Sequence, residues 1–122
     1  MDLTAFQLSN EAEEGRWFSM DEKTRVKVRS DDSENYQKIL RNTIDAYPNF
    51  RKLPRNTQGR VMSKAVATGL LIEWEHLEEN GNEIECTTEE KIRICENYPS
   101  FRRYVQELAS AAGNFRDNVE RD

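Results

Sequence analysis

The chain has 122 residues, with 18 lysines and arginines against 23 aspartates and glutamates, and its formal net charge is −5. A chain of this length can form one hydrophobic core without metal ions or disulfides. Its acidic balance argues against nucleic acid and anionic membranes as partners, and no apolar run approaches the roughly 20 residues of a membrane-spanning helix. Since the amino terminus also lacks the basic start and apolar run of a secretion signal, we expect one domain in the cytoplasm.

Three parts are expected along the chain. Residues 1–14 combine acidic side chains with a few apolar ones, which makes this segment a candidate for disorder. Residues 15–115 hold the patterned segments and are expected to form a single helical domain with a β-hairpin. Residues 116–122 are almost wholly polar or charged and are expected to fray.

A β-hairpin is predicted over residues 16–29. Val26 and Val28 alternate with basic residues, which is the two-residue period of a half-buried strand. Trp17 and Phe18 belong to the opposite arm. An isolated hairpin is only marginally stable in water, so these four side chains are expected to pack on a helix.

A first helix is predicted after the cap residues Ser30–Ser33. The residues that recur at its three- and four-residue spacing are Tyr36, Ile39, Leu40, Thr43, Ile44 and Tyr47. Pro48 ends this pattern. The segment from Pro48 to Asn56 is expected to be an ordered connection rather than a flexible linker.

The longest pattern starts at Thr57, which is expected to cap a central helix. Val66, Leu70, Trp74 and Leu77 follow at spacings of four, four and three residues. This spacing places the four side chains on one face of the helix, so the helix is predicted to be amphipathic.

Several single residues predict details of the helices. Gly69 lies inside the central pattern, where glycine costs roughly 1 kcal/mol relative to alanine, so we expect another backbone to approach closely there. Asn80 and Gly81 supply the turn that follows. Thr87 and Glu90 have the spacing of a capping box and predict the start of another helix.

A last helix is predicted to open at Pro99 or Ser100 and to end at Gly113. Its periodic residues are Phe101, Tyr104, Val105, Leu108 and Ala112. The expected fold is therefore mainly α, of the α+β class, with an amino-terminal β-hairpin packed on a bundle of about four helices.

The residues with reactive side chains nominate no catalytic, cofactor or metal site. Cys86, Cys95 and His76 lack both the spacing and the fourth ligand of a closed metal site, so Cys95 is expected to be a buried thiol. Neighbouring acids such as Glu89 and Glu90 are expected to be solvated charges rather than an acid–base pair. We therefore predict a protein that is not an enzyme.

A small basic patch is formed by Arg51, Lys52, Arg55 and Arg60, with Phe50 between them. Cations interleaved with an aromatic ring can bind single-stranded nucleic acid. So few cations supply few phosphate contacts, however, and the chain as a whole is acidic. We expect a solvated loop and no nucleic-acid partner.

The chain carries more aromatic residues than so short and polar a sequence needs for its core. Aromatic side chains dominate both cores and interfaces, and each single one is more often core. The candidates for a partner-binding surface are Leu70, Trp74, Leu77, Tyr98 and Phe101.

A family resemblance depends on several of these segments together. The residues that carry it are Gly15, Trp17, Phe18 and Val26–Arg29, then Ala65, Gly69–Glu75, Leu77, Asn80–Ile84 and Cys86–Lys91, then Tyr98–Arg102, Val105, Asn114 and Phe115. In this order and spacing they resemble the tail assembly chaperones of long-tailed, siphovirus-type phages and prophages. The resemblance extends over most of the chain, from about Gly15 to Phe115.

The resemblance implies a small, mostly helical protein that is not an enzyme. Such a protein would bind the long helical tape measure protein and keep it soluble while subunits of the major tail (tube) protein are recruited. It would leave before the particle is complete, so it would be found in the host cytoplasm and not in the mature virion. Self-association is common in the family, which adds a homo-oligomer to the expected partners.

Two other functions fit the sequence. The first is a structural connector or minor tail component, which would stay in the phage particle. The second is a small acidic inhibitor that mimics nucleic acid and blocks a host or defence protein. The carboxylates that suggest the inhibitor are those of Glu73, Glu75, Glu78, Glu79, Glu83 and Glu85.

Overall fold

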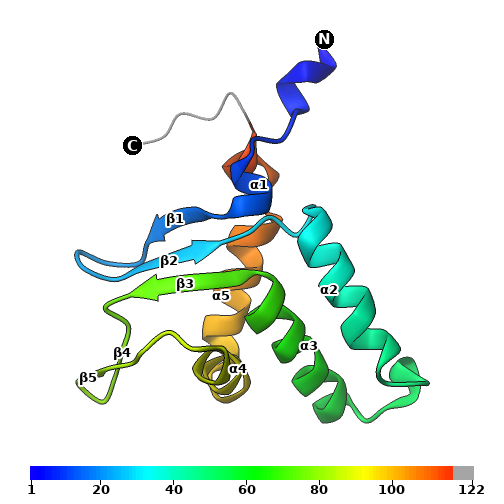
Figure 1. Cartoon of the computed structure of the whole chain (residues 1–122), viewed down its shortest axis with the longest axis vertical. Coiled ribbons are helices and arrows are strands. Elements are labelled where there is room, and N and C mark those ends of the chain that lie inside the picture. The colour runs from blue at the N-terminus through cyan, green and yellow to red at the C-terminus, as the bar shows by residue number, and fades with distance from the viewer. Residues whose placement is uncertain (117–122) are drawn as a thin grey trace.

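The computed structural model describes residues 1–116. Its elements in chain order, with η marking a 3-10 helix, are η1 (Leu3–Phe6), α1 (Glu11–Glu14), β1 (Arg16–Ser19), β2 (Arg25–Val28), α2 (Glu34–Asp45), η2 (Phe50–Lys52), α3 (Arg55–Gly69), β3 (Leu71–Glu75), β4 (Glu78–Glu79), β5 (Asn82–Glu83), α4 (Thr88–Asn97), α5 (Pro99–Ser110) and η3 (Ala112–Phe115). The predicted α+β class is confirmed, because the helices accompany a small antiparallel sheet (Figure 1).

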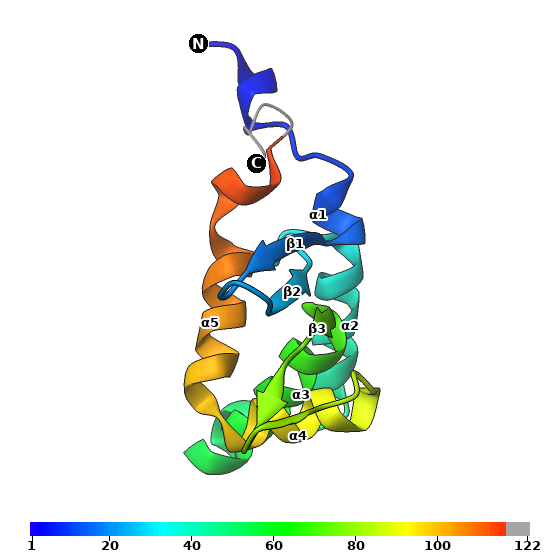
Figure 2. The same ribbon diagram turned by 90° about the vertical axis from the view of Figure 1, so that its left-hand side faces the viewer.

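The main sheet has three antiparallel strands in the order β1-β2-β3. β1 and β2 form the predicted hairpin, in which Phe18 lies opposite Val26. β3 pairs with the other side of β2 and places Trp74 opposite the same Val26. Helix α5 covers one face of this sheet (Figure 2), and Val26, Val28 and Trp74 are buried on that side.

Trp17 lies on the other face of the sheet. Because successive side chains of a strand point to opposite faces, only Phe18 of the Trp17–Phe18 pair packs against the core. The Trp17 ring instead faces the guanidinium of Arg25, 4.5 Å from its centroid, and the ammonium of Lys27, 6.0 Å away. The expectation that Trp17 packs on a helix is therefore wrong, and its contacts are cation–π contacts.

The predicted central helix is wrong at both ends. α3 begins at Arg55, directly after Pro54, and not at Thr57. It ends at Gly69, whose carbonyl accepts a hydrogen bond from the Arg29 guanidinium at 3.0 Å. The last carbonyls of a helix have no hydrogen-bond partner within the helix, so a cation there can donate to one of them. The positive charge also interacts favourably with the helix dipole.

The residues after Gly69 form the strand β3, which pairs with β2 instead of continuing the helix. Leu71 and Trp74 both face the core, although an ideal strand would place them on opposite faces. An irregularity in the register opposite Lys27 and Val28 makes this possible, as expected for a β-bulge.

Helices α2 and α3 lie side by side (Figure 1). Ser33 caps α2 as predicted, since its hydroxyl accepts from the Tyr36 amide at 3.1 Å. Tyr36 is buried, and a Cβ added at Gly69 would come within 2.7 Å of its ring. The close approach expected at Gly69 therefore exists, but a side chain of α2 makes it and not a backbone.

Helix α4 starts as predicted, and α5 ends earlier than predicted. The Thr87 hydroxyl accepts from the Glu90 amide at 3.1 Å. The Glu90 carboxylate does not complete a capping box, because it accepts from Arg93 instead. α5 begins at Pro99 and ends at Ser110, before Gly113, and η3 follows.

The amino-terminal segment pairs with the carboxyl-terminal end of the described chain. Leu8 forms a β-bridge with Arg116, and the Ser9 amide donates to the Phe115 carbonyl at 2.6 Å. Phe115 is fully buried, so this end belongs to the core. The predicted frayed tail, residues 116–122, lies almost wholly outside the described residues.

Candidate functional site

Three of the five candidate residues, Leu77, Tyr98 and Phe101, line one groove of about 500 Å³. The complete lining of this groove is Leu77, Glu78, Glu79, Asn80, Ile84, Ile94, Asn97, Tyr98, Pro99, Ser100 and Phe101. It thus combines apolar side chains with two carboxylates. Below, "the groove" means this set of residues.

One wall of the groove is the β4–β5 hairpin. Its strands pair over two residues each, and the Ile84 amide extends the pairing by donating to the Leu77 carbonyl at 2.8 Å. Asn80 and Gly81 form the turn with φ values of 52° and 83°. The predicted Asn-Gly turn is therefore present, and it brings Leu77 and Ile84 together as neighbours.

The opposite wall is the corner between α4 and α5. Tyr98 ends α4 and precedes Pro99, the first residue of α5. Proline suits the first position of a helix because it has no amide hydrogen to leave unpaired there. The Tyr98 side chain is 44% exposed, which is unusual for so large an apolar ring within residues 1–116 and makes it available to a partner.

A network of charges joins the two walls. Arg93 of α4 donates to Glu79 of β4 at 3.0 and 3.2 Å and to Glu90 at 2.6 and 2.9 Å. The Tyr98 hydroxyl also donates to Glu79. The hydrogen bonds from Arg93 and then Tyr98 lower the pKa of Glu79, and the same bonds raise the pKa values of Arg93 and Tyr98. The groove therefore keeps its anionic carboxylate when the solution becomes mildly acidic.

Leu70 and Trp74, the other two candidates, are not surface residues. Leu70 is 2% exposed and Trp74 is 4% exposed, and both belong to the core cluster. The Trp74 indole donates to the Ile84 carbonyl at 2.8 Å. Trp74 therefore supports a wall of the groove from the core side. Its burial leaves almost none of its ring accessible to a partner, so the structure does not favour it as a partner-binding residue.

Sequence reasoning missed Ile84, Ile94 and Pro99 as members of the groove. Ile84 follows the Asn-Gly turn by three residues, and a hairpin there would have placed it beside Leu77. Ile94 lies on the apolar side of α4 and was available from the helical spacing alone. The signal existed for both isoleucines, but for Ile84 it depended on ending α3 early.

A second hollow, of about 640 Å³, lies between the start of α2 and α5. Its lining includes the charged side chains of Asp31, Asp32, Arg103 and Glu107. Burial raises the pKa of Asp31, and Asp32 adds to the effect. Of the five candidates only the buried Leu70 lines this hollow, whereas the groove brings three of them together.

Neither thiol is activated towards the thiolate form in this fold. Cys95 is fully buried, as predicted, and burial raises its pKa to about 12. Burial also raises the pKa of the half-buried Cys86. Within residues 1–116, no group of three or more histidines, cysteines or acids is arranged to hold a metal ion. The same part of the chain contains no helix long and apolar enough to cross a membrane.

Comparison with known proteins gives one match. No curated protein and no solved structure matches the chain. The family model described as YdaY prophage protein matches residues 22–122, a range that includes the groove and every helix from α2 onward. Because that match covers most of the chain, the protein belongs to the YdaY prophage protein family.

Proposed function

We propose that this prophage protein is a non-catalytic assembly chaperone that binds the tape measure protein of a phage tail through the groove. The observation that carries the proposal is the meeting of Leu77, Tyr98 and Phe101 in one groove. These residues were selected from the sequence for a partner-binding surface, and the chain separates the first from the other two by about twenty positions.

The groove suits an amphipathic helix of the partner. A helix of this kind places one apolar face into a hydrophobic groove, and the apolar side chains of Leu77, Ile84 and Phe101 are available for it. The carboxylates of Glu78 and Glu79 line the same groove but are already paired with Lys23 and Arg93 of this chain, so the apolar side chains are what the groove offers a partner. A long helical tape measure protein offers such faces, and covering them keeps it soluble until the tail tube subunits arrive.

The acidic inhibitor is the second candidate function. Glu79, Glu83, Glu85 and Glu90 line a single hollow next to the groove, which is the observation in its favour. A mimic of nucleic acid needs carboxylates that are free to replace phosphates. Glu79 and Glu90 are instead engaged by Arg93, which favours the chaperone. The connector differs from both in staying within purified virions, where the chaperone is expected to be absent.

The test is to co-express this chain with the tape measure protein that is encoded near the gene of this chain. The solubility of the tape measure protein and its capture in a pull-down are then measured. The informative change is Tyr98→Ala, because the side chain is exposed and its loss leaves the core intact. The matched control is Tyr47→Ala, a tyrosine that is 38% exposed at the far end of α2. We expect Tyr98→Ala to weaken capture by about tenfold or more, the effect of ~1.4 kcal/mol at a central interface residue.

Circular dichroism of both variants verifies that the fold is retained. A tape measure protein that is equally soluble with and without this chain would contradict the chaperone. Equal losses of capture for Tyr98→Ala and Tyr47→Ala would show that the groove is not the binding surface.

A further inference from the structure

We propose that the hollow between the start of α2 and α5 binds a guanidinium group carried on a short apolar stem, such as the side chain of an arginine. This hollow, of about 640 Å³, is called the α2–α5 hollow below. It shares no lining residue with the groove, so the inference goes beyond the proposed function and does not rest on it.

One side chain of the lining is a buried tyrosine whose hydroxyl has no partner. Tyr36 is 5% exposed and lines the α2–α5 hollow. Its amide donates to the Ser33 hydroxyl, but its own hydroxyl makes no hydrogen bond within residues 1–116. Burial raises the pKa of Tyr36 and the charge of Asp31 adds to the effect, so the hydroxyl is within electrostatic reach of that carboxylate. Since buried polar groups are normally hydrogen-bonded, this hydroxyl is available to a ligand in the hollow.

Three carboxylates line the same hollow, those of Asp31, Asp32 and Glu107. Asp31 is half-buried, and burial followed by the charge of Asp32 raises its pKa. Within the described part of the chain, none of the three carboxylates forms an ion pair or accepts a hydrogen bond. A partly buried carboxylate without a partner is costly, so a cation that enters the hollow relieves this cost.

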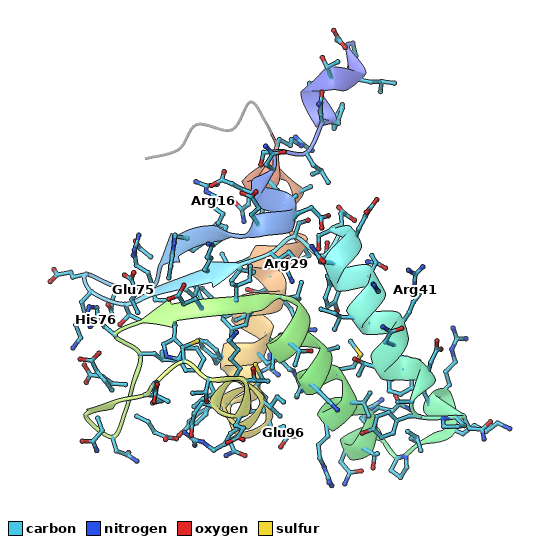
Figure 3. All side chains as sticks on the ribbon, viewed as in Figure 1. Arg16, Arg29, Arg41, Glu75, His76 and Glu96 are labelled. Atoms are coloured by element: carbon cyan, nitrogen blue, oxygen red, sulfur yellow. The ribbon has the colours of Figure 1, made fainter. Side chains whose placement is uncertain are left out.

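The cations of the chain that lie nearest do not fill the α2–α5 hollow. Arg29 lies close to the start of α2 (Figure 3), but its guanidinium donates to the carbonyls of Glu13 and Gly69 at 2.6 and 3.0 Å. Arg41 lies on the outer side of α2 (Figure 3). Arg103 belongs to the lining, yet it is exposed, donates to a serine of its own helix and pairs with no carboxylate of residues 1–116. The lining therefore keeps an excess of negative charge.

The shape and chemistry of the lining favour guanidinium over ammonium. The acceptors belong to two separate segments, the start of α2 and the middle of α5. A guanidinium has five donors in one plane and is weakly hydrated, whereas an ammonium is compact and strongly hydrated. Leu40 and Leu70 also belong to the lining, and they offer apolar surface to the stem of the ligand.

A metal ion is the other cation that carboxylates suggest. Among residues 1–116, however, no group of three or more acids, histidines or cysteines is arranged to hold one. A metal ion also gains nothing from the apolar part of the lining. The observations therefore favour the organic cation.

The experiment titrates the isotope-labelled full chain and follows its amide signals by NMR at constant ionic strength. The probes are butylguanidinium, butylammonium and butylurea, which is neutral and close in shape to butylguanidinium. The site variants are Asp31→Asn and Tyr36→Phe, which remove one charge and one hydroxyl. The matched controls are Asp45→Asn and Tyr47→Phe, made at exposed residues at the other end of α2.

We expect butylguanidinium to shift the amides of residues 31–37 and 103–110 in a saturable way, with a Kd on the order of 1 mM for so small a ligand. Butylammonium is expected to bind more weakly, and butylurea is expected not to bind. Tyr36→Phe should weaken binding of butylguanidinium by about two- to tenfold, the effect of one hydrogen bond, and Asp31→Asn by about tenfold or more. Both controls should bind as the wild type does.

Three results would overturn the inference. The first is a wild-type chain whose amides at the α2–α5 hollow show no saturable shift. The second is butylammonium or butylurea that binds as tightly as butylguanidinium. The third is a site variant, with a spectrum that shows the native fold, that binds as tightly as the wild type.

A blocked Ala-Arg-Ala peptide then identifies the source of the guanidinium. Binding as tight as that of butylguanidinium indicates an arginine of a polypeptide, whereas exclusion of the peptide alone indicates a free small molecule. Both results support the inference. None of these measurements includes the tape measure protein, so they can fail while the proposed function holds.

Discussion

At the scale of single residues, the two glycines inside α3 offer a matched test of packing. A Cβ at Gly69 would lie 2.7 Å from the Tyr36 ring, whereas the nearest atom to a Cβ at Gly59 is 3.9 Å away. We expect Gly69→Ala to destabilise the protein by about 1–3 kcal/mol through overpacking. Gly59→Ala is expected to stabilise it by up to ~1 kcal/mol, because alanine favours the helix. Urea unfolding followed by circular dichroism measures both, and a Gly69→Ala protein as stable as the wild type would contradict the packing argument.

The candidate site was predictable residue by residue only in part. Spacing identified Leu77 and Phe101 as apolar residues with a regular pattern, the surplus of aromatic residues added Tyr98, and the structure joins the three in the groove. The same spacing selected Leu70 and Trp74, which are buried. Periodicity shows that residues share a face of one helix, but it cannot show which face meets the core or that a helix has become a strand.

At the scale of secondary structure elements, local sequence signals predicted where helices begin better than where they end. Side-chain caps at Ser33 and Thr87 fixed the beginnings of α2 and α4, since a hydroxyl that accepts from an amide is a local interaction. The end of α3 depends on Arg29 and on pairing with β2, which are distant in sequence. Non-local contacts override local propensity there, so the third strand could not be predicted from the sequence around it.

The attachment of the β4–β5 hairpin to α4 is expected to depend on pH. Hydrogen bonds from Arg93 and Tyr98 lower the pKa of Glu79 below its ordinary value in the folded protein. The stabilisation by Glu79 is therefore present above the pKa of the unfolded chain, about 4.3, and is lost as the pH falls through the lower folded value. We expect the protection factors of the hairpin amides, which compare the observed exchange with intrinsic exchange at the same pH, to fall in that acidic range.

Two substitutions separate this effect from general acid unfolding. Glu79→Gln removes the titrating group and is expected to give hairpin protection factors that no longer change in the same pH range. Glu85→Gln is the control, because Glu85 is exposed and makes no ion pair within residues 1–116, so its profile should follow the wild type. Identical profiles for all three proteins would show that Glu79 does not hold the hairpin.

At the scale of the whole molecule, the described ends of the chain differ in how they join the core. Residues 1–14, the candidate for disorder, contain η1 and α1, but Leu3 is 79% exposed and Phe6 is 46% exposed. Phe115 near the other end is fully buried instead, with the centroid of its ring 6.1 Å from that of Phe18. The cooperative body of the protein therefore includes Phe115 and excludes most of the first eight residues.

Deleting residues 2–8 should consequently change the free energy of unfolding little. The hydrogen bond from the Ser9 amide to the Phe115 carbonyl stays, and the contacts that are lost are exposed ones. We expect a loss below about 1 kcal/mol, which lowers Tm by no more than ~4–8 °C for a domain of this size. Phe115→Ala is the comparison and should cost about 3–5 kcal/mol, since it removes a fully buried ring. Differential scanning calorimetry distinguishes the two, and a deletion as destabilising as Phe115→Ala would make the amino-terminal segment part of the cooperative core.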